Sequence, residues 1–230
     1  EVGPTTHYVM GGIRVNADTQ ESTVSGLFAA GECAAGINGA NRLGGNSLSD
    51  LIVFGKRAGE FAAKFAKENS KFTIDQSQIE SIVKATLEPF EREGGENPYT
   101  IQSDLQEMMQ ANVGIVRQHD EMVEALNGLD VLRNRAARTY VPGNIDFNPA
   151  WHTALDLHNL LIVSEAIARS AIERRESRGG HFRDDFPDKD PEFAKFNFAV
   201  KKSAGGGMEI SRIPIPEMPA ELKAVIEEMG

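Results

Sequence analysis

The middle of this 230-residue chain repeats apolar side chains at the spacing of α-helices. Four stripes lie within residues 79–90, 105–116, 122–132 and 155–172, where apolar residues recur every three or four positions. This period places the apolar side chains of each stripe on one face of a helix. Because short loops join the stripes, the pattern predicts a helical bundle.

The flanking segments predict a small β part. Residues 8–15 and 24–30 form a hairpin-like pair of strands, and two more strands are predicted over 194–200 and 208–216. Residues 34–45 are rich in Gly, Ala and Asn and predict a loop. A helix then begins near Asn46 or Ser47, and Ser47 with Asp50 forms a capping-box-like start. A short helix is expected over 220–229, so the predicted fold class is mainly α with a small β part.

Composition excludes several classes of protein and site. The net charge is -10 and no Lys/Arg cluster exceeds a pair, so a nucleic-acid-binding surface is not expected. The single cysteine, Cys33, allows no disulfide within the chain and is predicted to be a small buried side chain. No apolar run reaches the roughly 18 residues of a membrane span. His152 and His158 are too poorly spaced to predict a metal site.

The loop before the first predicted helix contains the strongest candidate for ligand binding. Residues 39–48 read Gly-Ala-Asn-Arg-Leu-Gly-Gly-Asn-Ser-Leu. The guanidinium of Arg42 is planar and permanently charged, and it can bind a carboxylate through two parallel hydrogen bonds. Glycines around it allow the backbone and a ligand to approach closely. Taken alone, however, an arginine in a loop is more often a solvated surface residue.

Four other residues are candidates of the same kind. The imidazole of His7 can donate a hydrogen bond to a carboxylate, and Glu32 ends an apolar strand, where it could accept hydrogen bonds from a diol. Ser47 and Leu48 begin the predicted helix, whose first N–H groups carry partial positive charge. Without further context, His7 could equally be a structural histidine and Glu32 a solvated loop residue. Ser47 and Leu48 could equally belong to an ordinary helix start.

Three blocks together indicate a family. They are His7-Tyr-Val-Met-Gly-Gly12, the decamer 39–48 followed by residues 50–55, and the helical segment 105–117. Along nearly its whole length the chain resembles the C-terminal part of the succinate dehydrogenase/fumarate reductase flavoprotein subunit. One position departs from the family pattern, since Asn38 stands where a histidine usually precedes Gly-Ala-Asn-Arg.

The resemblance implies roles for these residues. His7 and Arg42 would contact a dicarboxylate substrate, and Glu32, Ser47 and Leu48 would contact FAD. The charged run 174–184 resembles the family's Glu-Ser-Arg-Gly-x-His-x-Arg segment, and we expect it to be a solvated, salt-bridged turn that forms a structural network and has no catalytic role. No residue of the chain matches the family's proton-transferring arginine, so no catalytic residue is assigned.

The resemblance also implies an activity and partners. Succinate would lose a hydride to FAD, or fumarate would gain one, and the electrons would pass to an iron–sulfur subunit in respiratory electron transport and the tricarboxylic acid cycle. We expect a cytoplasmic protein, peripheral on the inner face of the membrane and attached only indirectly through anchor subunits. The chain has no Gly-x-Gly-x-x-Gly strand–turn–helix for FAD. We therefore expect a fragment that lacks the N-terminal Rossmann half and the capping domain and is inactive by itself.

The resemblance divides the chain into three parts. Residues 1–70 would form the C-terminal segment of the FAD-binding domain, 71–192 the helical bundle, and 193–230 a tail of strand and helix. Two alternatives stay open. L-aspartate oxidase shares Gly-Ala-Asn-Arg and Asn-Ser-Leu, but it usually reads Met-Ala-Ser where this chain has residues 43–45, Leu-Gly-Gly. Residues 75–190 could also be a helical module that docks a partner.

Overall fold

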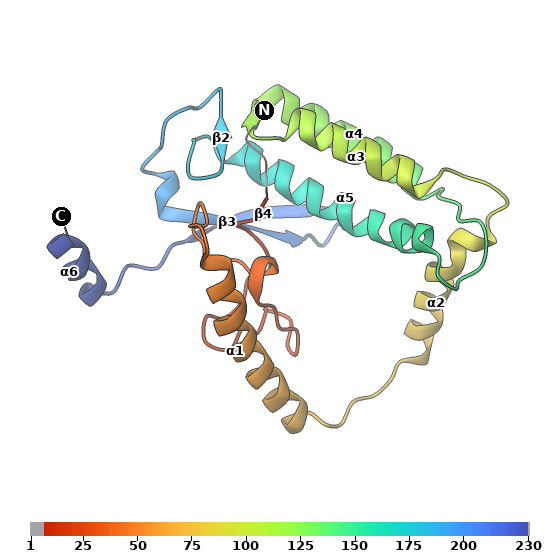
Figure 1. The fold of residues 1–230 in the computed structure, drawn as a ribbon, viewed down its shortest axis with the longest axis horizontal. Coiled ribbons are helices and arrows are strands. Elements are labelled where there is room, and N and C mark those ends of the chain that lie inside the picture. The colour runs from red at the N-terminus through yellow and green to blue at the C-terminus, as the bar shows by residue number, and fades with distance from the viewer. Residues whose placement is uncertain (1–6, 230) are drawn as a thin grey trace. The chain divides into compact units, whose positions relative to one another are not determined.

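The computed structural model describes residues 7–229 and is mainly helical (Figure 1). The helices are α1 (Asn46–Glu68), α2 (Gln76–Glu91), α3 (Pro98–Asn112), α4 (His119–Ala136), α5 (Pro149–Glu173) and α6 (Ala220–Met229). The strands are β1 (Val116–Arg117), β2 (Phe182–Arg183), β3 (Phe196–Lys202) and β4 (Met208–Pro214), and two 3-10 turns cover Gly31–Cys33 and Phe193–Lys195. The predicted fold class, mainly α with a small β part, is confirmed.

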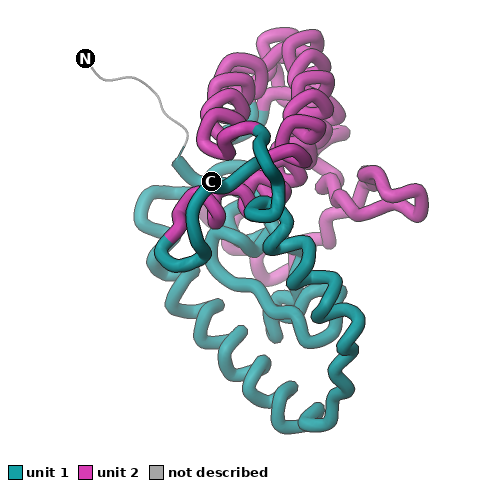
Figure 2. The backbone as a smooth tube through the Cα atoms, turned by 90° about the vertical axis from the view of Figure 1, so that its right-hand side faces the viewer, with its two compact units in different colours: residues 1–95, 140–147, 178–181 teal, residues 96–139, 148–177, 182–230 magenta. Residues whose placement is uncertain are grey.

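The chain forms two compact units (Figure 2). The first, here called the loop unit, holds the residues up to Gly95 together with 140–147 and 178–181. The second, here called the bundle unit, holds residues 96–139, 148–177 and those from 182 onward. Helix α2 belongs to the loop unit, so three of the four apolar stripes lie in the bundle unit.

The bundle unit is built on α3, α4 and α5, which pack against one another as the apolar stripes predict. Its core is a cluster of buried aliphatic side chains: Ile101, Leu105, Leu129, Leu132, Leu157 and Leu161. Each fully buried side chain of this size contributes about 1.5–3 kcal/mol relative to exposure. Asn97 and Asn148 cap α3 and α5, and a proline follows each cap at the first helical position, where no N–H is needed.

Strands β3 and β4 pair as an antiparallel hairpin in the bundle unit, from Phe196 opposite Pro214 to Lys202 opposite Met208. This confirms the two strands predicted near the C-terminal end, and α6 confirms the short helix beyond them. Strands β1 and β2 add a short parallel pair. Among the described residues, no helix is both long and apolar enough to cross a bilayer.

The predicted hairpin over residues 8–15 and 24–30 is wrong. The structure has only isolated bridges there: Ile13–Ala34, Val15–Ser22 and Glu21–Phe28. Glycines explain the interruption, because Gly12 and Gly26, one in each predicted strand, have φ angles of +146° and +82° and turn the chain out of the extended conformation. The segment therefore folds as connected turns that lead into the loop before α1.

Helix α1 begins at Asn46, as predicted, but its capping differs from the prediction. Gly45, with a φ of +84°, is the N-cap, and no side chain caps the helix. The capping box of Ser47 and Asp50 is therefore not formed. The Asp50 side chain is instead buried and faces Tyr8, far away in the sequence.

Candidate active site

Tyr8 lies at the centre of the candidate site in the loop unit. The guanidinium carbon of Arg42 lies 4.5 Å from the centroid of the Tyr8 ring, a cation–π contact. The His7 ring meets Tyr8 edge-on, with ring centroids 6.5 Å apart. The two predicted substrate-contacting residues, His7 and Arg42, therefore share one aromatic neighbour.

The buried carboxylate of Asp50 contacts the Tyr8 hydroxyl. The Tyr8 hydroxyl donates to Oδ2 of Asp50 at 3.4 Å, and Asp50 is only 3% exposed. Burial raises the pKa of the Tyr8 phenol, and the negative charge of Asp50 raises it further. The other Asp50 oxygen, Oδ1, is buried and has no hydrogen-bond partner among the described residues.

Arg42 keeps donors available. Its Nη1 donates to the carbonyl of Leu43 at 3.3 Å, whereas its Nε is buried and finds no partner among the described residues. Buried polar groups in proteins are nearly always hydrogen-bonded, and those left unpaired usually mark a place where a ligand or water supplies the partner. The half-buried Arg42 side chain is thus set up to receive an anionic acceptor.

Glu32 lies beside the same N-terminal segment. It sits in the 3-10 turn Gly31–Cys33, is exposed, and accepts the Val9 N–H at 3.0 Å through Oε1. A carboxylate has about four acceptor positions, so Glu32 can accept ligand hydroxyls as well. Cys33, predicted to be buried, is exposed, and its thiol donates to the Ala30 carbonyl at 3.3 Å.

The first turn of α1 presents N–H groups without a side-chain cap. Leu48 donates to the Gly45 carbonyl at 3.2 Å and its side chain is 67% exposed, while Ser47 is half-buried. The positive end of the helix dipole adds to the attraction for an acceptor oxygen. A pocket of about 240 Å³ opens beside this turn. It is lined by Ile37, Asn38, Asn46, Ser49, Asp50, Val53 and Phe54.

The structure thus gathers the predicted site residues around residues 7–9 and the start of α1. Reasoning from the sequence missed two members, Tyr8 and Asp50. Tyr8 could have been found as the neighbour of His7 in the motif, but Asp50 had been interpreted as a helix cap. The chemical properties of the group suit a dicarboxylate on the cationic side and a hydroxyl-rich cofactor near Glu32 and the helix start.

The charged run 174–184 is less solvated than predicted, because part of it is buried. In the bundle unit, Arg183 is 0% exposed. Its Nη1 donates to the carbonyls of Ala171, Ile172 and Arg174 at 2.9, 3.2 and 3.3 Å, near the end of α5. Such carbonyls have no partner within the helix, so a buried guanidinium that satisfies them fastens the helix end.

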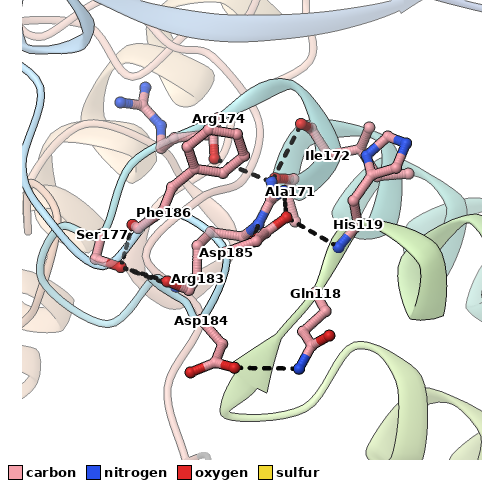
Figure 3. Close-up of polar contacts among 10 residues, drawn as sticks. All are labelled: Gln118, His119, Ala171, Ile172, Arg174, Ser177, Arg183, Asp184, Asp185 and Phe186. Atoms are coloured by element: carbon pink, nitrogen blue, oxygen red, sulfur yellow. Dashed lines mark hydrogen bonds and ion pairs between the residues drawn. The ribbon is translucent and has the colours of Figure 1, made fainter.

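Asp185 neutralises Arg183. Its two carboxylate oxygens accept from Nε and Nη2 of Arg183 at 2.7 and 2.6 Å, and its Oδ2 also accepts the His119 N–H at 3.1 Å (Figure 3). These hydrogen bonds from Arg183 lower the pKa of Asp185 below its usual value. The pKa of Arg117 is lowered by burial and then by the charge of Arg183. The run is therefore a salt-bridged structural network, as expected, but Glu176, Ser177 and Arg183 within it are buried rather than solvated.

Comparison with protein families assigns the chain. Residues 102–226 match the family described as fumarate reductase flavoprotein C-term, and residues 1–48 match an FAD binding domain. The chain belongs to the succinate dehydrogenase/fumarate reductase flavoprotein family. It corresponds to the tail of the FAD-binding domain and the C-terminal domain of that family, as predicted, and the family binds FAD.

Curated relatives and solved structures agree with the family assignment. The chain is 40% identical over 195 residues to the fumarate reductase flavoprotein subunit of Haemophilus influenzae, a match that covers 82% of this chain and 32% of the relative. It is 38% identical to the succinate dehydrogenase flavoprotein subunit of Coxiella burnetii, covering 81% of this chain and 34% of the relative. The Sdh1 complex of Mycobacterium smegmatis in the apo form superimposes with a TM-score of 0.86 at 46% identity, over 93% of this chain and 36% of that one. The chain thus spans about a third of the length of these relatives.

Proposed function

We propose that this chain forms the substrate-facing tail of an FAD-dependent flavoprotein that interconverts succinate and fumarate. The observation that carries the proposal is Arg42, whose guanidinium stacks on Tyr8 and keeps a buried Nε without a partner among the described residues. A dicarboxylate supplies the acceptor that this donor lacks. Relatives named as fumarate reductase and succinate dehydrogenase flavoprotein subunits support the choice of substrate.

Arg42 and His7 would hold the two carboxylates of the substrate. A fixed guanidinium orients the substrate and stabilises negative charge that develops during the reaction. His7 also contacts the Tyr8 ring and is exposed, so its imidazole is accessible to the second carboxylate. We assign no proton-transferring residue to this chain.

Glu32, Ser47 and Leu48 would hold the cofactor. Glu32 would accept a hydroxyl of the sugar chain, and the N–H groups of the first turn of α1 would donate to carbonyl oxygens of the ring. When bound, FAD supplies the hydride acceptor: succinate gives up one hydride and one proton and becomes fumarate. The uncapped helix start and the exposed Glu32 fit this cofactor.

The proposal extends to the assembly. Electrons would pass to an iron–sulfur subunit, and the chain would reach the membrane only through anchor subunits, on the cytoplasmic face. Structural similarity to the Sdh1 complex and to the quinol fumarate reductase of Escherichia coli, with TM-scores of 0.86 and 0.83, supports this arrangement. We also propose that the segment 1–70 acts with the rest of an FAD-binding domain and that this chain by itself is inactive.

The test is turnover by the complete flavin-loaded enzyme carrying Arg42→Ala. We expect kcat/KM for succinate and fumarate to fall by about 100-fold or more, because one preorganised donor to a developing charge is commonly worth that much. Arg57→Ala is the matched control, since Arg57 lies on α1 in the same unit but pairs with Asp18 at 3.6 Å, away from Tyr8. Turnover of aspartate in place of succinate would favour the oxidase alternative. Unchanged turnover in Arg42→Ala would overturn the assignment of Arg42.

A further inference from the structure

A tight turn far along the sequence lies against the Arg42 loop. Residues 178–181, Arg-Gly-Gly-His, belong to the loop unit. Arg178 and His181 close the turn, because each main-chain N–H donates to the carbonyl of the other, at 2.8 and 3.0 Å. Gly179 occupies the tip with a φ of +59°.

The turn is hydrogen-bonded to the residue two positions before Arg42. The Gly180 N–H donates to the Ala40 carbonyl at 2.9 Å. Glycines with positive φ, Gly39 and Gly45, flank Arg42 on either side, so the loop gains little rigidity from its own sequence. A main-chain contact from outside the loop is therefore an effective way to restrict it.

The approach is close enough to require glycine. A Cβ at position 179 would lie 2.2 Å from the Ala40 carbonyl oxygen and 2.7 Å from the Ala40 Cβ. A Cβ on Gly180 would meet only the terminal methyl of Met10, at 3.1 Å, among close contacts. Since that methyl is the end of a flexible side chain, Gly180 tolerates a side chain where Gly179 does not. Met10 itself lies two residues after Tyr8, so the turn contacts both segments that build the site.

We propose that the Gly179–Gly180 turn is a positioning element for Arg42. It acts through Ala40, holding the loop so that the guanidinium stays over Tyr8, and it does not touch the substrate. The proposed function gives the charged run 174–184 no role. The turn at residues 178–181 within that run would affect the affinity for the substrate. The inference rests on the proposed function of Arg42 as a dicarboxylate-binding residue.

The experiment compares Gly179→Ala with Gly180→Ala in the complete flavin-loaded enzyme, with succinate as the probe. Because a displacement of about 1 Å in a positioning group is costly, we expect Gly179→Ala to raise KM for succinate roughly tenfold and to lower kcat less. Gly180→Ala should change KM by less than about threefold, since only the Met10 methyl must move. Gly206→Ala is the strain control, since Gly206 has a φ of +90° and no atom within 4 Å of an added Cβ.

A double-mutant cycle separates positioning from general damage. In an Arg42→Ala background, Gly179→Ala should cause no further loss of kcat/KM, because both changes remove the same interaction. Losses that multiply independently would overturn the inference. Gly180→Pro removes the N–H that donates to the Ala40 carbonyl, and it decides the matter if Gly179→Ala does not load flavin. We expect KM to be higher in Gly180→Pro than in Gly180→Ala, which keeps this N–H, and equal KM values in these two variants would also overturn the inference. If the wild-type enzyme does not turn over succinate, the proposed function itself fails.

Discussion

The loop unit and the bundle unit treat buried polar groups in opposite ways. In the bundle unit, buried Arg183 donates to three main-chain carbonyls and to both oxygens of Asp185. In the loop unit, Arg42 Nε and Asp50 Oδ1 are buried without partners among the described residues. Leaving such a group unpaired costs about 1–3 kcal/mol.

The contrast separates a scaffold from a site. The bundle unit combines apolar clusters with satisfied charges, and both add to its stability. The loop unit is built from turns and isolated bridges around glycines, and it leaves buried donors and acceptors without partners among the described residues, which under the proposed function a ligand would satisfy. Changes in the bundle unit should therefore alter stability, and changes in the loop unit should alter affinity.

The sharpest test of the scaffold is Arg183→Met. We expect the free energy of unfolding to fall by about 3–5 kcal/mol, because removing one partner leaves Asp185 and the α5 carbonyls uncompensated. Urea unfolding of this chain followed by tryptophan fluorescence measures it, since Trp151, the only tryptophan, lies in α5.

Lys195→Met is the matched control for that experiment. The side chains of the Lys195–Glu192 pair are 64% and 72% exposed, and exposed pairs contribute about 0–1 kcal/mol. If Arg183→Met and Lys195→Met lowered the free energy of unfolding equally, the buried network would be no more stabilising than a surface ion pair.

A smaller loss of stability is expected when the pH is lowered. The pKa of Asp185 is lowered in the folded state by Arg183, so the unfolded chain binds this proton more tightly than the folded chain does. The stability from this pair is therefore complete above the unfolded pKa of about 3.9 and is lost as pH falls through the lower folded pKa. The Trp151 unfolding midpoint should decline below about pH 4, and Asp185→Asn should make that decline shallower. An identical acid decline in Asp185→Asn would exclude this pair as the cause.

The smallest effect is expected in the loop unit, from Tyr8→Leu. Losing the aromatic face under Arg42 should raise KM for succinate roughly fivefold in the flavin-loaded enzyme, and Tyr8→Phe, which keeps the ring, should raise it less. Tyr99→Leu, on α3 in the bundle unit, serves as the control for loss of a tyrosine ring. An effect of Tyr8→Phe on KM as large as that of Tyr8→Leu would show that the hydroxyl bond to Asp50, not the stacking, matters.

Local patterns in the sequence predicted much of this protein. The period of the apolar residues predicted α3, α4 and α5, and alternation predicted β3 and β4. The motif around Arg42 singled out a residue that the structure places on Tyr8. The hairpin over residues 8–30 was wrong because alternation alone does not reveal that Gly12 and Gly26 adopt positive φ angles.

Only the tertiary structure decided the partners of the charged and polar side chains. Arg183 belongs to a charged run that looks solvated in the sequence, yet it is buried, because the end of α5 and Asp185 together satisfy its donors. Asp50 looks like a helix cap from its spacing, yet it accepts a hydrogen bond from Tyr8, 42 positions away. Helices and strands follow from interactions between near neighbours, which the sequence displays directly. The partner of a charged side chain depends on which distant segments of the chain come into contact. That partner determines whether the charge stabilises the fold or stays available to a ligand.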